Sequence, residues 1–146
     1  KIHEFCREIG DLTILFFSCL IMSFGRRKYM NDGIRIIPFE DGLTIKIFGE
    51  LDSYHVLGYK EKIVLEMRKH QASKLLWDLK NVSLFDSAGI GLILGRYNEI
   101  RRVGGMCGFL TLSTYTRKIV NLTGLSSIMD EYKNVNEFKK RGKITI

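Results

Sequence analysis

From Ile34 onward the chain alternates between two kinds of segment. Short apolar runs of strand length, such as residues 74–79, are separated by longer segments whose apolar residues recur at helical spacing. A dense apolar run between polar flanks is typical of a parallel strand that is buried on both faces. The alternation therefore predicts an α/β domain with a mixed sheet and right-handed crossovers between its parallel strands.

Periodicity and turn residues place the expected elements. Residues 34–39 and 43–49 alternate as strands do, and the turn signal Glu40-Asp41-Gly42 between them predicts an antiparallel hairpin. We expect Gly49 to end the second strand and Asn81 to lie in a later turn. Further strands are predicted at 74–79, 106–112 and 127–132, and helices at about 53–70, 87–103, 114–124 and 134–140. The result is a four- to five-stranded mixed sheet with about four helices.

Polar residues and glycines mark the expected helix ends. Asp52 or Ser53 is expected to cap the first helix, and Ser113 or Thr114 the third, because their side chains accept hydrogen bonds from free backbone N–H groups. Gly104-Gly105 predicts that the second helix ends in a left-handed cap.

Residues 1–29 do not continue this pattern. Residues 12–22 are almost continuously apolar, but a helix needs about 20 such residues to span a bilayer, so no membrane anchor is expected. Acidic residues precede the run and no small-x-small cleavage site follows it, which argues against a signal peptide. Residues 25–28, Gly-Arg-Arg-Lys, are what a purine-rich ribosome-binding sequence would encode if it were translated in frame, and they lie just upstream of Met30. We therefore expect Met30 to be the native start, residues 1–29 to be translated upstream DNA, and the domain to cover 30–141.

The amino-acid composition argues against nucleic-acid binding, a disulfide framework and a metal site. Lys and Arg number 23 against 16 Asp and Glu, a net charge of +7, but no arginine-rich run or basic-aromatic pattern predicts direct nucleic-acid binding. The three cysteines form no CxxC pair, and the three histidines have no metal-ligand spacing, so neither a disulfide framework nor a metal site is predicted. This cysteine usage favours a cytoplasmic location.

Three glycines at the start of the second helix raise the question of a nucleotide site. Gly89, Gly91 and Gly95 follow a strand, but their GxGxxxG spacing differs from the GxGxxG dinucleotide fingerprint. The acidic residue expected about 20 positions later is also absent. Packing is the simpler interpretation, because glycines on one helix face allow close approach to the sheet or to a partner.

Ser87 lies where a predicted strand leads into this helix, at the sheet edge where ligand sites usually form. Nucleophilic catalysis would need a histidine base, and the GxSxG elbow of serine hydrolases is absent. Two compatible interpretations remain, a helix cap and a phosphate acceptor. A phosphate would place about −1.5 to −2 charges at the positive end of the helix, beside the repelling Asp86. For Asp86 we weigh a second cap against orientation of Ser87 or contact with a kinase.

Four stretches of the chain resemble the anti-sigma factor antagonists of the STAS family, most closely those that act in sporulation. They are Gly49-Glu50-Leu51-Asp52, Phe85-Asp86-Ser87-Ala88-Gly89-Ile90-Gly91, Ile93-Leu94-Gly95-Arg96-Tyr97 and Val103-Gly104-Gly105. The resemblance runs from about Met30 to Lys140. The family's central motif is Asp-Ser-Ser-Gly-Leu-Gly, whose first serine corresponds to Ser87, whereas Ala88 replaces the second serine.

The resemblance implies a regulator that exchanges partners and is not an enzyme. The unphosphorylated protein would bind its anti-sigma factor, a serine kinase that uses ATP, and so free a sporulation sigma factor. Phosphorylation of Ser87 would break this complex, and a PP2C-type phosphatase would restore it. The resemblance implies no catalytic residue, metal, tightly bound cofactor or membrane contact. It places the following residues at the partner-binding surface, Asp52 less directly than the others: Asp86, Ser87, Ala88, Gly89, Gly91, Arg96 and Asp52.

Three alternatives stay open at this point. A general stress-response antagonist would use the same switch with a different sigma factor. A nucleotide-binding STAS module rests on the weak nucleotide contacts that the family suggests. The cytoplasmic module of an anion transporter would follow a long membrane domain, and the chain has no apolar span of about 20 residues.

Overall fold

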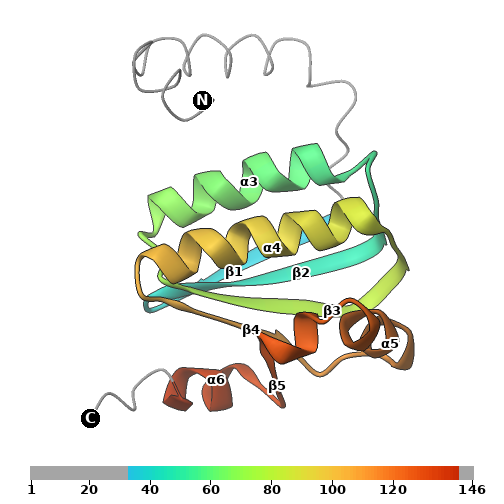
Figure 1. Ribbon diagram of the computed structural model, residues 1–146. Coiled ribbons are helices and arrows are strands. Elements are labelled where there is room, and N and C mark those ends of the chain that lie inside the picture. The colour runs from blue at the N-terminus through green and yellow to red at the C-terminus, as the bar shows by residue number, and fades with distance from the viewer. Residues whose placement is uncertain (1–32, 142–146) are drawn as a thin grey trace, which may run out of the picture. The chain divides into compact units, whose positions relative to one another are not determined.

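The structure, a computed structural model, describes residues 33–141, so the predicted extension over residues 1–29 and the predicted start at Met30 lie outside the described residues. The elements in chain order are β1 (Ile34–Phe39), β2 (Gly42–Leu51), α3 (Val56–Lys69), β3 (Lys74–Phe85), α4 (Ser87–Arg102), β4 (Met106–Leu110), α5 (Thr114–Leu122), the 3₁₀ turn η2 (Leu125–Ser127), β5 (Asp130–Tyr132) and α6 (Val135–Arg141) (Figure 1). Over residues 33–141, no helix is both long and apolar enough to cross a membrane.

The five strands form one mixed sheet in the order β1-β2-β3-β4-β5, which confirms the predicted α/β architecture. β1 and β2 form the predicted antiparallel hairpin, with Ile34 opposite Ile47 and Phe39 opposite Gly42. The other three pairs are parallel. The carboxyl ends of β2, β3 and β4 therefore lie at one edge of the sheet, where they lead into α3, α4 and α5.

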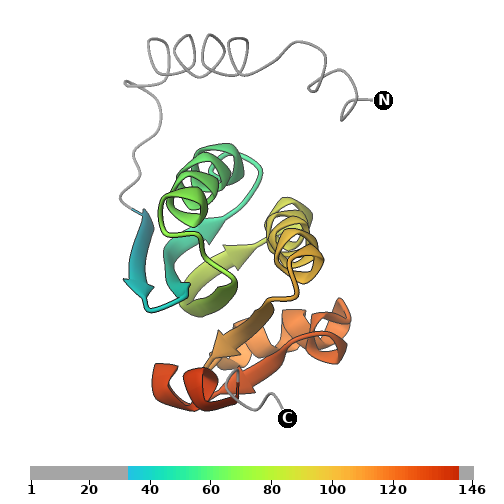
Figure 2. The same cartoon turned by 90° about the vertical axis from the view of Figure 1, so that its left-hand side faces the viewer.

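Helices cover the two faces of the sheet unequally. Figure 2 shows α3, α4 and α5 on one face and α6 on the other. The larger core lies under the first three helices and includes the fully buried Trp77 and Ile93. A smaller cluster under α6 includes Leu76 and Phe138. Full burial of one large apolar side chain contributes about 1.5–3 kcal/mol, so the larger core holds the helices to the sheet.

Two strands are longer than periodicity predicts. β3 continues beyond residue 79 to Phe85 and β2 continues to Leu51, so the predicted strand end at Gly49 and the predicted turn at Asn81 are wrong. The two strands extend together, since Leu51 pairs with Phe85. Gly49 lies at a register shift with φ +85°, where glycine allows a bulge within the strand and does not end it.

Two helices begin or end at predicted residues. Ser113 caps α5 in a capping box with Thr116. After α4, Gly104 takes φ +72°, and the Gly105 N–H donates to the carbonyl oxygen of Ile100 at 2.9 Å. This is the Schellman arrangement, which gives the last carbonyl groups of the helix their hydrogen bonds.

Other element ends differ from the predictions. The N-cap residue of α3 is His55, and not Asp52 or Ser53, because a turn precedes the helix. The strand predicted to end at residue 112 ends at Leu110. The strand predicted over 127–132 is shortened to β5, because η2 ends at Ser127 with Ile128 as its C-cap residue and the strand begins only at Asp130.

Alanine substitutions at two glycines test the packing of α4. A Cβ at Gly105 would collide with the carbonyl oxygen of Ser73, so we expect Gly105→Ala to lower the free energy of unfolding by about 1–3 kcal/mol. A Cβ at Gly95, inside the helix, would meet nothing within 4 Å among residues 33–141, so Gly95→Ala should raise the free energy of unfolding by about 0.5–1 kcal/mol. Urea unfolding followed by circular dichroism measures both changes. Changes of the same sign would contradict this account.

Candidate functional site

The first turn of α4 carries the candidate phosphate acceptor. Ser87 is the first residue of the helix and is exposed, and Asp86 is the N-cap residue. Asp86 Oδ1 accepts hydrogen bonds from the backbone N–H groups of Ala88 at 2.8 Å and Gly89 at 3.2 Å. The interpretation of Ser87 as the helix cap is therefore wrong, and the interpretation of Asp86 as the helix cap is confirmed. Since the Asp86 carboxylate satisfies the helix N–H groups, capping does not occupy the Ser87 hydroxyl.

Asp86 also joins the start of α4 to β2 and to the loop that follows β2. Its Oδ2 accepts a hydrogen bond from the backbone N–H of Ser53 at 3.1 Å. Its own N–H donates to the carbonyl oxygen of Leu51 at 3.2 Å. The carboxylate therefore bonds to backbone donors of two segments that are more than 30 residues apart, and these bonds fix the backbone that carries Ser87.

The glycines of the motif have different environments. Gly89 is buried, and a Cβ there would lie 2.7 Å from both Cγ and the carbonyl oxygen of Leu51, so the close approach of α4 to β2 requires glycine. Gly91 is exposed, and a Cβ there would meet nothing within 4 Å in the part of the chain that the structure describes. Packing therefore explains Gly89 and does not explain Gly91. Gly91 instead leaves a low surface about one helical turn from Ser87.

Arg96 lies on the opposite side of the helix from this low surface. It is 5% exposed and shares the buried face of α4 with Gly89 and Ile93. Its Nη2 donates to Glu99 Oε1 at 3.1 Å, whereas its Nε and Nη1 are buried without a hydrogen-bond partner in the described part of the chain. The structure therefore corrects the expectation that Arg96 offers an exposed contact to a partner.

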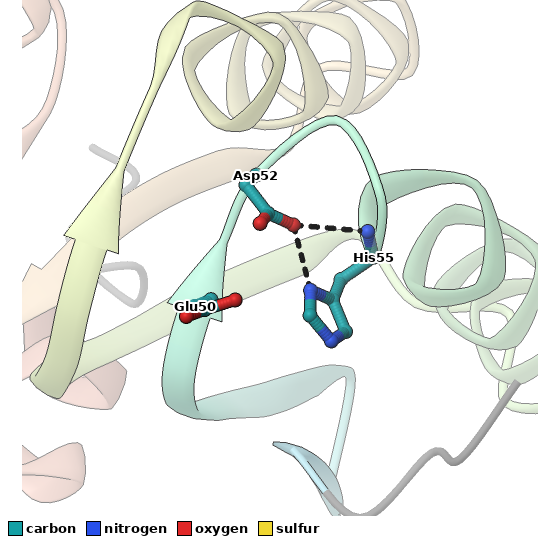
Figure 3. A group of neighbouring side chains, drawn as sticks. All are labelled: Glu50, Asp52 and His55. Carbon is teal, nitrogen blue, oxygen red and sulfur yellow. Dashed lines mark hydrogen bonds and ion pairs between the residues drawn. The ribbon is translucent and has the colours of Figure 1, made fainter.

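A cluster of three titratable side chains lies at the end of β2 and in the loop that leads from it to α3 (Figure 3). The ligand atoms of Glu50, Asp52 and His55 lie within 4.8 Å of one another, a group that sequence spacing alone did not indicate. Asp52 Oδ1 accepts from the His55 backbone N–H at 3.1 Å and lies 2.6 Å from His55 Nδ1. Carboxylate and imidazole groups are metal ligands in other proteins. Here Asp52 and His55 bond to each other and hold the turn before α3.

The side chains of this cluster shift the pKa values of Asp52 and of the neighbouring Tyr59. The hydrogen bond from the His55 side chain is the main cause that lowers the pKa of Asp52. Burial, and then the negative charges of Asp52 and Glu50, raise the pKa of Tyr59. The loop therefore carries a stabilised carboxylate on the segment whose Ser53 N–H bonds to Asp86.

Comparison with known proteins matches this arrangement to a family and to named relatives. The model of the STAS domain family matches residues 31–138. The chain is 34% identical over 87 residues to the anti-sigma F factor antagonist of Lysinibacillus sphaericus, which covers 60% of this chain and 74% of that protein. It is 31% identical over 101 residues to the anti-sigma-B factor antagonist of Bacillus subtilis, which covers 69% of this chain and 91% of that protein.

Solved structures show the same fold. The anti-sigma factor antagonist SpoIIAA in its unphosphorylated form superimposes with a TM-score of 0.61 and 25% identity, over 77% of this chain and 99% of that one. The phosphorylated form of SpoIIAA from Bacillus superimposes with a TM-score of 0.59 and 28% identity, over 74% and 97% of the two chains.

Substitution of Asp86 tests its two structural roles. Asp86→Ala removes the cap of α4 and the bond to the loop after β2, so we expect the free energy of unfolding to fall by about 1–2 kcal/mol. Asp86→Ser keeps a capping oxygen but is too short to reach both partners, so it should recover part of this loss. Urea unfolding of the three proteins gives the comparison. An Asp86→Ala protein as stable as the wild type would contradict the assignment.

The pH dependence of stability tests the bond between Asp52 and His55. Because the pKa of Asp52 is lowered below its ordinary 3.8 in the folded protein, its stabilising effect is complete above that ordinary value and is lost as the pH falls through the lowered one. The wild type should therefore be more stable than Asp52→Asn near neutral pH, and the difference should shrink below about pH 4. Urea midpoints of both proteins across this range measure it. A difference that does not change with pH would contradict the account.

Proposed function

The chain belongs to the STAS domain family, and from this premise we propose that it is an anti-sigma factor antagonist that is switched off by phosphorylation of Ser87. In the unphosphorylated state it would bind an anti-sigma factor and free a sporulation sigma factor. The observation that carries the proposal is the exposed Ser87 at the start of α4, whose hydroxyl is left available because Asp86 caps the helix. The relatives named anti-sigma factor antagonists support the identity of the partner.

The geometry suits a switch that acts at an interface. Around the unphosphorylated serine the surface is low, because Gly91 has no side chain and Ala88 has a small one. A phosphate on Ser87 would add about −1.5 to −2 charges, which the N-terminus of α4 tolerates. In a close-packed interface the same charge would have to lose water beside Asp86, which repels it. The phosphate is therefore expected to weaken partner binding more than it affects the fold.

The proposal assigns complementary roles to the partners. The anti-sigma factor would act as an ATP-dependent serine kinase on Ser87, and a PP2C-type phosphatase would remove the phosphate. The chain itself would be a substrate and regulator and not an enzyme, and it would act in the cytoplasm. The solved phosphorylated form of SpoIIAA supports an antagonist that can carry a phosphate.

A second candidate is a general stress-response antagonist with the same switch. The similarity to the anti-sigma-B factor antagonist of Bacillus subtilis supports it, since that relative is 31% identical over 69% of this chain. Binding measured separately to the anti-sigma F factor and to the anti-sigma-B factor would distinguish the two candidates.

Phosphorylation with localisation of the phosphate tests the proposal directly. The 146-residue chain would be incubated with ATP and, in separate reactions, the anti-sigma F factor of Lysinibacillus sphaericus and the anti-sigma-B factor of Bacillus subtilis. Mass spectrometry should find one phosphate, on Ser87, that is absent from Ser87→Ala and present in Ser53→Ala. A phosphate on another residue, or none from either factor, would count against the proposal.

Charge substitution tests the switch without a kinase. Ser87→Ala should bind the anti-sigma factor about as tightly as the unphosphorylated wild type and stay bound when ATP is present. Ser87→Asp should bind at least about tenfold more weakly, a change of about 1.4 kcal/mol, because it places a charge beside Asp86. Asn98→Asp adds the same charge to an exposed position about three turns along α4 and should leave affinity unchanged. Isothermal titration calorimetry measures the affinities, and equal values for wild type and Ser87→Asp would exclude an electrostatic switch.

A further inference from the structure

A tyrosine of α5 holds the strand end that leads into the candidate site. We propose that Tyr115 is a positioning residue for Ser87, which acts through a hydrogen bond to the backbone of Phe85. The inference rests on the proposed function, because it concerns the position of the serine that would be phosphorylated. It adds a residue outside the motif, 28 positions along the chain from Ser87.

The need for such a residue arises from unequal strand lengths. β3 pairs with β4 only from Lys74 opposite Met106 to Trp77 opposite Phe109, whereas its pairing with β2 continues to Phe85. Within residues 33–141, β3 therefore has a strand neighbour beyond Trp77 on the β2 side and none on the β4 side. Backbone groups that point toward the β4 side must find hydrogen bonds elsewhere.

Phe85 supplies one of these backbone groups. The N–H of the next residue, Asp86, points toward β2 and donates to the carbonyl oxygen of Leu51. Because successive N–H groups of an extended strand point in opposite directions, the Phe85 N–H points away from β2. Phe85 is 7% exposed, and its N–H donates to the Tyr115 hydroxyl oxygen at 3.2 Å. The tyrosine hydroxyl thus accepts the hydrogen bond that a neighbouring strand would otherwise accept.

The location of Tyr115 suits this role. It is the second residue of α5, a helix whose start is fixed by the capping box of Ser113 and Thr116. Arg117 adds a second anchor, because its Nη2 donates to the carbonyl oxygen of Leu112 at 3.3 Å and to Glu131 Oε1 at 2.6 Å. Figure 1 shows α5 beside the end of β3. A well-anchored helix start therefore presents the hydroxyl to the strand end.

The turn that carries Ser87 is consequently held from both sides. On one side Asp86 bonds to Leu51, and on the other side Phe85 bonds to Tyr115. Without the tyrosine hydroxyl, the turn keeps its bonds to the β2 side only. Ser87 would then sample more positions relative to the ATP of a bound kinase, although the contact surface offered to that kinase would be unchanged. The expected loss is therefore in the rate of phosphate transfer and not in binding.

Steady-state phosphorylation of the full chain tests the inference. The kinase is whichever of the anti-sigma F factor and the anti-sigma-B factor phosphorylates the wild type on Ser87. Tyr115 is 42% exposed, and Tyr115→Phe keeps its ring and removes only the hydrogen-bond acceptor. We expect kcat to fall about fivefold with KM unchanged, and amide exchange at Phe85, measured by NMR without any kinase, to become faster by about tenfold.

Matched variants separate positioning from partner contact. Tyr54→Phe removes a hydroxyl from an exposed tyrosine in the loop after β2 and should leave kcat, KM and the exchange at Phe85 unchanged. Wild-type kcat in Tyr115→Phe overturns the inference, as does a raised KM at unchanged kcat, which would make Tyr115 a partner contact. Absence of phosphate on Ser87 in the wild type with both factors overturns the proposed function, and with it this inference, whatever the exchange at Phe85 shows.

Discussion

The pairing of β2 with β3 extends further than the pairing of β3 with β4, and the geometry of the candidate site depends on this difference. β2 and β3 stay together to Leu51 and Phe85, whereas β4 leaves the ladder at Phe109. The turn into α4 therefore follows a two-stranded extension of the sheet, in which β2 and β3 pair beyond the last β3–β4 pair. This extension leaves Ser87 exposed, but its backbone needs hydrogen bonds from neighbouring segments to hold it in place.

Asp86 provides several of these bonds and also determines whether the hydroxyl of the neighbouring Ser87 is available. Because its carboxylate takes the hydrogen bonds of the first helical N–H groups and of Ser53, the serine hydroxyl is spared from capping. The same carboxylate occupies the donors that a phosphate at the helix start would otherwise use, and it carries a like charge. In the proposed switch, one residue thus exposes the phosphate acceptor and keeps the added phosphate from being neutralised within the domain.

Sequence patterns predicted the elements well and their contacts less well. Apolar periodicity was sufficient for the sheet and the helices, but β3 runs on through residues 80–84, where Lys80, Asn81 and Ser83 interrupt the dense apolar run. Asp and Ser have similar capping preferences, so sequence could not decide between Asp86 and Ser87. The helical phase of Arg96, in register with Ile93, was a usable signal for burial that its charge obscured. No local pattern could indicate the bond from Phe85 to Tyr115, because it joins segments 30 residues apart.

Rigidity near Ser87 determines how the proposed switch can work. Gly89 packs against Leu51, and Asp86 and Tyr115 hold the turn from two sides, so a phosphate on Ser87 would appear at a defined place. A switch at such a site does not need to move a helix. Like charges brought together in an interface cost several kcal/mol, and each 1.4 kcal/mol is about a tenfold change in affinity. In the proposed switch, a loss of binding of about a hundredfold or more would therefore follow from charge and desolvation alone, with the fold of the domain unchanged.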